Sequence, residues 1–293
     1  SVLLQPFYLK LVNNSLVLFD QGDFQLKAFS LDTGKQLWQF GRRGQGPWEI
    51  SQLNDLQVSS AGTILLADGA NARVTELDST GGRLRMVPLR STMRILPIAN
   101  GGFLAKGGLK PYWDAFDSKG NPTGSLSIPD FLSGLEYLAA EPINEAIDEL
   151  HSAIAFRWSD RLILLDQRGR VFASGRGPER IEFPTISTYK ARSAAEGDIT
   201  ISRVSPDATW AAFAVTQVGS EIWVLFVGAS KDAGRLLDRF DRRSAAYLGS
   251  LRLPHRPIGI AGLGERRVAV LFDEPEPRVD ILTWIPRAAE PPR

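Results

Sequence analysis

The feature that most constrains the fold of this chain is a short motif that recurs along it. Each copy joins one or two apolar residues to an aspartate and a tight turn, which ends in glycine in the clear copies. The aspartates of the four clear copies are Asp32, Asp78, Asp117 and Asp166, and Asp241 marks a weaker fifth copy. Successive aspartates are 46, 39, 49 and 75 residues apart. A repeat of this length indicates one supersecondary unit used several times, and the long last interval predicts an insertion in the fifth unit.

The chemistry of the motif predicts a β-hairpin at each copy. An aspartate side chain accepts hydrogen bonds from the backbone just beyond it, and glycine adopts the positive φ angle of a tight turn. Short apolar runs, such as 64–67 and 162–165, end at these turns. Strands of about four to eight residues with frequent turn signals are typical of an all-β protein.

The length of the repeat predicts the architecture. A unit of about 45 residues holds four short antiparallel strands, which is the size of one β-propeller blade. The 293 residues have room for six. We therefore expect a single all-β domain over 1–286, a six-bladed β-propeller of four-stranded antiparallel blades, followed by a Pro-rich C-terminal tail over 287–293. The expected blades span about 7–50, 51–91, 92–128, 149–185, 197–253 and 256–286.

One stretch has a different pattern. Within residues 129–150, the apolar residues Ile143, Ile147 and Leu150 fall at positions i, i+4 and i+7. This spacing predicts a short helical insertion near 130–150. Such a helix usually packs on the body of its own fold, and a partner-binding role is the alternative.

Two further stretches carry a specific motif. The first comprises Phe40, Gly41, Gly44, Gly46 and Pro47, and the second comprises Asp68, Asn71 and Arg73. Glycines let the chain cross between blades where side chains would clash, and proline fixes the exit direction. Asp68 and Asn71 are suited to cap a turn, and Arg73 to pair with an acid or a carbonyl. We interpret both stretches as a structural blade junction, and not as a phosphate loop, because the Gly-Lys-Ser/Thr ending is missing.

These two stretches resemble the bacterial six-bladed β-propellers related to NHL repeats. The likeness covers residues 29–82, where a Phe-Gly pair, a Gly-x-Gly-Pro turn and an Asp-x-x-Asn-x-Arg-Val motif follow one another. The resemblance implies that these motifs link successive blades. It also implies that enzymes of this kind hold metals with several inward histidines or carboxylates. This chain has only two histidines, His151 and His255, so we predict no metal, no cofactor and no catalytic residue.

Composition excludes other classes of function. Lys and Arg number 34 against 33 Asp and Glu, which argues against a nucleic-acid groove because such a groove needs an excess of cations. There is no cysteine, so disulfides and thiol chemistry are excluded. No apolar run has the length of a transmembrane helix.

Aromatic and basic residues suggest where a partner would bind. Trp48 and the Tyr112-Trp113 pair lie beside Pro and Gly near expected blade junctions, and Arg239, Arg242 and Arg243 form a basic group in the fifth unit. Aromatic and Arg side chains are the usual anchors of protein interfaces. The alternatives are core packing for the aromatics and a solvated face for the arginines. The other tryptophans of the strand patterns are expected to pack between blades, namely Trp38, Trp158, Trp210, Trp223 and Trp284.

Three functions remain open. The favoured one is a non-catalytic, protein-binding or scaffolding propeller, exported to a bacterial periplasm and serving as an extrinsic subunit of a membrane-associated complex, such as an electron-transfer or photosynthetic assembly. The start at Ser1 would then reflect removal of a signal peptide. The second is a lyase or hydrolase with a carboxylate-bound metal at the central channel. The third is a small-ligand or glycan sensor, with Trp113 in an open cleft.

Overall fold

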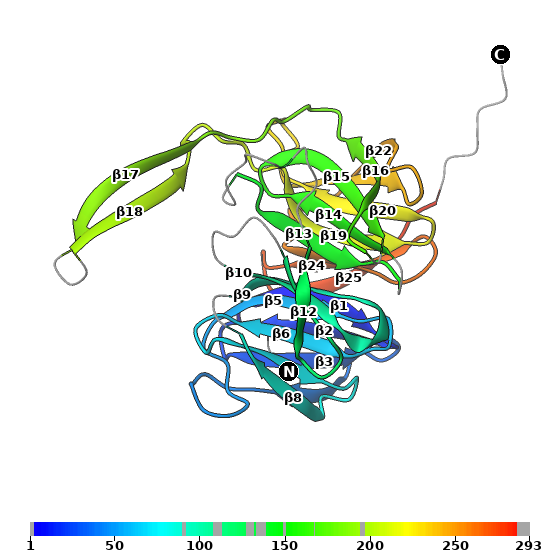
Figure 1. Cartoon of the computed structure of the whole chain (residues 1–293). Coiled ribbons are helices and arrows are strands. Elements are labelled where there is room, and N and C mark those ends of the chain that lie inside the picture. The colour runs from blue at the N-terminus through cyan, green and yellow to red at the C-terminus, as the bar shows by residue number, and fades with distance from the viewer. Residues whose placement is uncertain are drawn as a thin grey trace, which may run out of the picture.

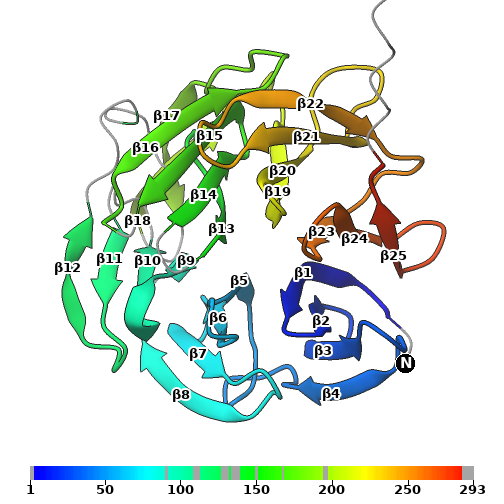
Figure 2. The same ribbon diagram turned by 90° about the vertical axis from the view of Figure 1, so that its right-hand side faces the viewer.

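The computed structural model describes residues 3–89, 92–107, 113–126, 132, 139–148, 151–166, 168–193 and 197–285. Over these residues the chain forms 25 strands and one 3₁₀ turn, Ala99–Gly101. Six antiparallel sheets stand around a ring, each with its first strand nearest the centre, as seen along the axis of the ring in Figure 2. The predicted all-β, six-bladed β-propeller is confirmed. The tail over 287–293 lies outside the described residues.

The strands follow one another outward within each blade. The first blade holds β1 (Pro6–Val12), β2 (Ser15–Asp20), β3 (Gln25–Ser30) and β4 (Gln36–Phe40). The second holds β5 (Leu53–Val58), β6 (Ile64–Asp68), β7 (Arg73–Leu77) and β8 (Arg83–Pro88). The third holds β9 (Thr92–Pro97), β10 (Phe103–Gly107), β11 (Trp113–Phe116) and β12 (Pro122–Leu126). The fourth holds β13 (Pro142–Ala146), β14 (His151–Phe156), β15 (Ser159–Asp166) and β16 (Val171–Arg176). The fifth holds β19 (Ala212–Val218), β20 (Glu221–Phe226), β21 (Leu236–Asp241) and β22 (Tyr247–Arg252). The sixth has three strands in the described part of the chain, β23 (Gly259–Gly262), β24 (Arg267–Phe272) and β25 (Arg278–Thr283).

The hydrophobic core is divided into six clusters, one between each pair of neighbouring blades. The cluster between the first and second blades contains Phe19 and Leu66, for example, and the other clusters repeat this arrangement around the ring. The last cluster packs Leu9 and Leu18 of the first blade against Leu271 of the sixth. This contact closes the ring, so apolar packing joins the two ends of the described propeller.

The aspartates of the repeated motif lie in the turns between third and fourth strands. Asp78, Asp117 and Asp166 each accept hydrogen bonds from backbone N–H groups two and four residues on. The glycines that follow, Gly81, Gly120 and Gly169, have φ angles of 80°, 82° and 72°. In the fifth blade Asp241 caps a turn whose left-handed residue is Ala245, at φ 56°.

The first copy of the motif is arranged differently. Ser30, and not Asp32, accepts the backbone N–H of the turn, from Thr33. The carboxylate of Asp32 instead accepts a hydrogen bond from Asn14. The reason is a shorter spacing, because only one residue separates Asp32 from Gly34.

The predicted helical insertion is wrong where the structure describes it. Residues 142–146, which include Ile143, form β13, the innermost strand of the fourth blade. Ile143 lies opposite Ala155 of β14, so an extended backbone satisfies its hydrogen bonds in the sheet. The fourth blade consequently begins at 142 and not at 149. Residues 129–131, 133–138, 149 and Leu150 lie outside the described residues.

The insertion predicted from the 75-residue interval is a hairpin, and the fifth blade begins at 212 and not at 197. β17 (Ile186–Ser193) and β18 (Gly197–Val204) pair with each other and with no blade strand of the described chain. Figure 1 shows them projecting far beyond the ring. We call residues 186–204 the arm. Because the arm lies between β16 and β19, it replaces a connection from an outermost strand to the next innermost strand.

Candidate functional site

The blade-junction residues hold one another through backbone contacts. Phe40 ends β4, and the other four residues, Gly41, Gly44, Gly46 and Pro47, lie between β4 and β5. A Cβ on Gly44 would overlap the carboxylate of Glu49. Arg73 Nη2 donates to Gly46 O at 2.8 Å and to Glu49 O at 2.6 Å. Asn71 Nδ2 donates to Gly44 O at 3.0 Å, and Asp68 accepts the backbone N–H groups of Ser51 and Gln52. These contacts fix the path of the chain from the first blade to the second.

The aromatic candidates for partner binding are less accessible than the sequence suggests. Trp113 is buried at the start of β11, in the cluster between the third and fourth blades. Trp48 is half-buried against the cluster between the first two blades, with the guanidinium of Arg83 5.3 Å from its ring centroid. Tyr112 lies outside the described residues.

The three candidate arginines do not form one open patch. Arg239 donates to both oxygens of Glu221 at 2.7 and 2.6 Å, and its guanidinium lies 3.8 Å from the ring centroid of Trp284. Arg242 pairs with Asp148 at 3.8 Å. Arg243 is exposed.

A site that the sequence did not reveal lies at the centre of the ring. The first strands of the blades enclose a cavity of about 410 Å³ at the face where these strands begin. Its walls are largely apolar, and the lining includes Phe7, Phe24, Leu53, Ile143, Phe213 and Ile258. Among them stand the polar side chains Tyr8, Asp55, Arg94 and Arg157.

β-Bulges shape this mouth. Four innermost strands carry one extra residue near their beginnings, in β1 between Phe7 and Lys10 and at Asn54, Met93 and Phe213. A bulge interrupts the hydrogen-bond ladder and turns backbone groups away from the sheet. In β1 the bulge contains Tyr8 at φ 51°, a rare angle for a residue other than glycine. The mouth therefore has carbonyl oxygens that are free to accept other donors.

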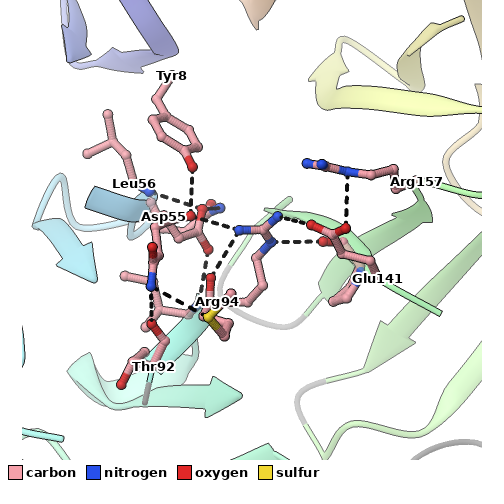
Figure 3. A network of polar contacts seen from close by, with 12 residues as sticks. Tyr8, Asp55, Leu56, Thr92, Arg94, Glu141 and Arg157 are labelled. Carbon is pink, nitrogen blue, oxygen red and sulfur yellow. Dashed lines mark hydrogen bonds and ion pairs between the residues drawn. The ribbon is translucent and has the colours of Figure 1, made fainter. Parts of the chain in front are cut away.

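Arg94 uses these carbonyl oxygens. Its Nη1 donates to Asn54 O at 2.7 Å and to Met93 O at 3.0 Å, and its Nε donates to Pro142 O at 3.0 Å. Tyr8 Oη also donates to Asn54 O, at 2.6 Å, and burial raises the pKa of this phenol to about 12. Figure 3 shows Arg94 at the middle of this network.

Glu141 joins Arg94 to Arg157 (Figure 3). Its Oε1 accepts a hydrogen bond from Arg94 Nη2 at 2.7 Å, and its Oε2 lies 3.2 Å from Arg157 Nε. The contact at 3.2 Å lacks hydrogen-bond geometry, so Arg157 Nε is a buried donor without a hydrogen-bond partner in the described structure. Two guanidinium groups thus share one carboxylate.

Asp55 is the other carboxyl group of the cavity. It accepts hydrogen bonds from the backbone N–H of Ile95 at 3.0 Å and from Gln57 Nε2 at 3.1 Å. Burial raises the pKa of Asp55 above its ordinary value, and the nearby Arg94 only partly opposes this effect. The carboxyl group therefore resists ionisation.

The floor of the cavity is polar and tightly bonded. Lys10 pairs with Glu145, Gln57 donates to Asn144 O at 3.1 Å, and Asn144 donates to Ile95 O at 2.7 Å. Beyond this floor a second cavity of about 400 Å³ opens toward the other face, and Lys10 lines both. This half-buried ion pair lies between the two spaces.

The two histidines lie outside the central cavity. His151 Nδ1 lies 3.0 Å from Asp148 Oδ1, and the His255 ring packs edge-on against Phe272. Over the described ranges, no three His, Asp or Glu side chains are arranged to hold a metal ion. None of the described helical structure is long and apolar enough to cross a membrane.

Comparison with known proteins identifies the fold and not the family. No protein-family model and no curated protein match the sequence. A putative exported protein from Bacteroides fragilis is 13% identical, with a TM-score of 0.59, over 93% of this chain and 80% of that chain. Virginiamycin B lyase from Staphylococcus aureus is 12% identical, with a TM-score of 0.54, over 96% and 84%. The β-propeller domain of Swd1 from Myceliophteria thermophila is 13% identical, with a TM-score of 0.56, over 96% of both chains.

At these identities the likeness shows the fold alone. The chain is a six-bladed β-propeller with a closed ring and a central cavity that opens among the beginnings of its innermost strands. Its relation to NHL repeats stays a prediction. The charged residues of the cavity were missed at the sequence level, although a charged residue inside each of the apolar segments 6–12, 53–58 and 92–97 was a usable signal.

Proposed function

We propose that this protein is a non-catalytic, protein-binding propeller, and that the arm is the part that docks a partner. The observation that carries the proposal is the isolation of the arm. Its two strands of eight residues pair only with each other among the described strands. Functional loops of a repeat protein are expected where the chain departs from the repeat, and the arm is such a departure.

The arm has the chemistry of a strand-addition site. A two-stranded hairpin alone is marginally stable in water, and both of its edges present unpaired backbone groups. An extended segment of a partner pairs with such an edge through main-chain hydrogen bonds. Tyr189, 44% exposed, adds an aromatic anchor, with the guanidinium of Arg203 5.6 Å from its ring centroid.

The arm and the cavity belong to the same face of the ring. In a four-stranded antiparallel blade the outermost strand ends on the face where the innermost strand begins. The arm is part of the connection from the outermost strand β16 to the innermost strand β19. The cavity opens among the beginnings of these same strands. A partner on the arm would therefore approach the face of the ring that carries the cavity mouth.

The state of the cavity carboxylates supports binding over catalysis. The enzyme alternative needs carboxylate oxygens that converge on a metal ion. Here Glu141 is engaged by two arginines, and Asp55 accepts hydrogen bonds from Ile95 and Gln57. Both are held as acceptors within the protein.

The proposal includes a location outside the cytoplasm, as an extrinsic subunit of a membrane-associated complex of the electron-transfer or photosynthetic kind. The lack of cysteine suits an oxidising compartment such as the periplasm. The similar protein from Bacteroides fragilis is described as a putative exported protein.

The test compares complexes formed in the native host. The tagged full chain, a variant with a short Gly-Ser linker in place of 186–204, and the surface control Leu248→Ala are extracted mildly and examined by native mass spectrometry. We expect the wild type and the control in a complex larger than the 32.2 kDa chain, with slowed hydrogen exchange over the arm, and the linker variant as free monomer. Wild-type protein found only as free monomer would refute the scaffold function. A complex that keeps the linker variant would refute the role of the arm.

A further inference from the structure

We propose that the central cavity binds a small organic anion, a molecule with an aromatic or aliphatic body and one carboxylate or sulfonate group that pairs with Arg157. This inference does not depend on the proposed partner function. It rests on the cavity walls, on the hydrogen-bonding state of Arg157 and on the balance of charge in the site.

The apolar walls and the volume of the cavity favour a ligand with a small apolar body. Phe7, Phe24, Leu53 and Phe213 line the cavity from three different blades. A space of about 410 Å³ lies within the usual range for small-molecule sites, which are mostly apolar with a few polar groups that fix orientation. An aliphatic chain or one or two aromatic rings would leave water and pack against these apolar side chains.

Arg157 is the group that remains available to the ligand. The hydrogen-bond partners of Arg94 are the protein's own acceptors, whereas neither terminal nitrogen of Arg157 donates to any described residue. Its Nε is buried and without a hydrogen-bond partner, as described above. Arg157 lies in the turn between β14 and β15, and Figure 3 shows its guanidinium pointing into the space between Glu141 and Tyr8. A guanidinium group offers two parallel donors that match a carboxylate.

An aromatic wall holds this guanidinium in position. The Arg157 guanidinium lies 5.5 Å from the ring centroid of Trp210. Trp210 in turn stacks on Phe213, with centroids 6.3 Å apart, and Phe213 lines the cavity as the extra residue of the β19 bulge. The cation and the apolar wall are therefore adjacent parts of one surface.

The charge of the cavity favours an anion. Arg94 and Arg157 share the single carboxylate of Glu141. Asp55, the other acid of the site, accepts hydrogen bonds from the backbone N–H of Ile95 and from Gln57, and burial raises its pKa. Lys10 and Glu145 compensate each other at the floor. Arg157 therefore presents its positive charge to the cavity beside apolar walls, where low polarity strengthens its attraction for an anion.

The test uses two fluorescent probes that differ mainly in charge, the anion 1-anilinonaphthalene-8-sulfonate and the neutral N-phenyl-1-naphthylamine. Both are titrated into the wild type, Arg157→Gln and Arg161→Gln. The matched control, Arg161, lies on β15 away from the cavity lining and pairs with Glu182 at 3.7 Å. Melting followed by circular dichroism checks that each variant is folded.

We expect one saturable sulfonate site in the wild type. Arg157→Gln should weaken the anion at least tenfold and the neutral probe less than twofold, while Arg161→Gln should leave both within twofold. Equal anion affinity in the wild type and Arg157→Gln would overturn the proposal, as would unsaturable adsorption of the sulfonate at many sites.

A second measurement needs no variant. Decanoate and decanol share an apolar chain and differ in the acid group, and each competes with the sulfonate probe on the wild type. We expect decanoate to displace the probe at a concentration at least tenfold lower than decanol. Equal potency would mean that the cavity recognises only the apolar body and would refute the role of Arg157.

Discussion

At the scale of single residues, local and distant contacts differ in how well the sequence predicts them. The turn aspartates were predictable because Asp78, for example, bonds to backbone two and four residues away. The network of Arg94 was not, because its acceptor at Asn54 lies 40 residues away and Glu141 lies 47 residues away. Only the packing of the second, third and fourth blades around the axis brings these groups together.

Arg94 should be essential for the stability of the mouth. Arg94→Met removes the donor of Pro142 O, one of the two donors of Asn54 O and one of the two cationic partners of Glu141. This loss should lower the free energy of unfolding by about 3 kcal/mol. The exposed Arg42 is the control, since Arg42→Met should change the free energy of unfolding by about 0.5 kcal/mol or less. Urea unfolding of the two variants measures both values, and equal losses would show that the network contributes little.

Protonation of the buried Asp238 should make the protein more stable in mild acid than at neutral pH. Burial raises the pKa of Asp238 to about 6, and although Ser250 donates to Oδ1 at 2.5 Å, the buried Oδ2 has no partner in the described structure. A carboxyl group whose folded pKa is raised binds protons more tightly in the folded state. Its stabilising contribution is therefore complete below its unfolded pKa, near 3.8, and is lost as pH rises through about 6.

Between pH 7 and pH 5 this group should add about 1 kcal/mol to the free energy of unfolding. Asp238→Asn, which cannot ionise, should flatten the profile in this range while the wild type retains its slope. Denaturant titrations at several pH values measure the difference. An unchanged slope in the variant would assign the pH dependence to other groups.

At the scale of elements, strand pairing determines the secondary structure where the spacing of apolar residues is ambiguous. The spacing of Ile143, Ile147 and Leu150 suits one face of a helix, yet 142–146 form a strand because β14 offers a complete pairing partner from Pro142 to Ala146. Three apolar residues are too few to distinguish the two structures. The arm was foreseen only as an insertion of unspecified structure, because hairpin strands without a buried face have no strong hydrophobic period.

The arm should be dispensable for folding. Because its strands pair with no blade among the described residues, replacing 186–204 by a Gly-Ser linker should shift Tm by about 1 °C or less. Calorimetry of the wild type and the linker variant measures this shift. A loss of several degrees would mean that the arm supports the ring and is not a separate docking element.

At the scale of the whole molecule, the packing of the first blade against the sixth closes the ring and stabilises it. The repeat length and turn chemistry sufficed to predict six blades, since each blade is a local unit. The bulges at the central mouth could not be predicted, because they reflect how the innermost strands crowd around one axis. Leu18 and Leu271, both fully buried, meet where the first and last blades pack together.

Weakening this closing contact should weaken the entire propeller. Leu271→Ala should reduce the free energy of unfolding by about 3 kcal/mol, whereas Leu248→Ala, at an exposed position, should change it by about 0.5 kcal/mol or less. Urea unfolding followed by tryptophan fluorescence should still show one transition for each variant. Separate transitions for the terminal and middle blades would show that the ring does not unfold as a unit.

The ion pair between Lys10 and Glu145 affects how a solute could move through the centre of the ring. This pair and its hydrogen-bonded neighbours lie between the two cavities. A solute would therefore have to displace them to pass from one cavity to the other, whereas entry and exit at the mouth would need no such change. The arm leaves the ring on the face of the mouth, so a solute of the cavity and a partner of the arm would approach the protein from the same side.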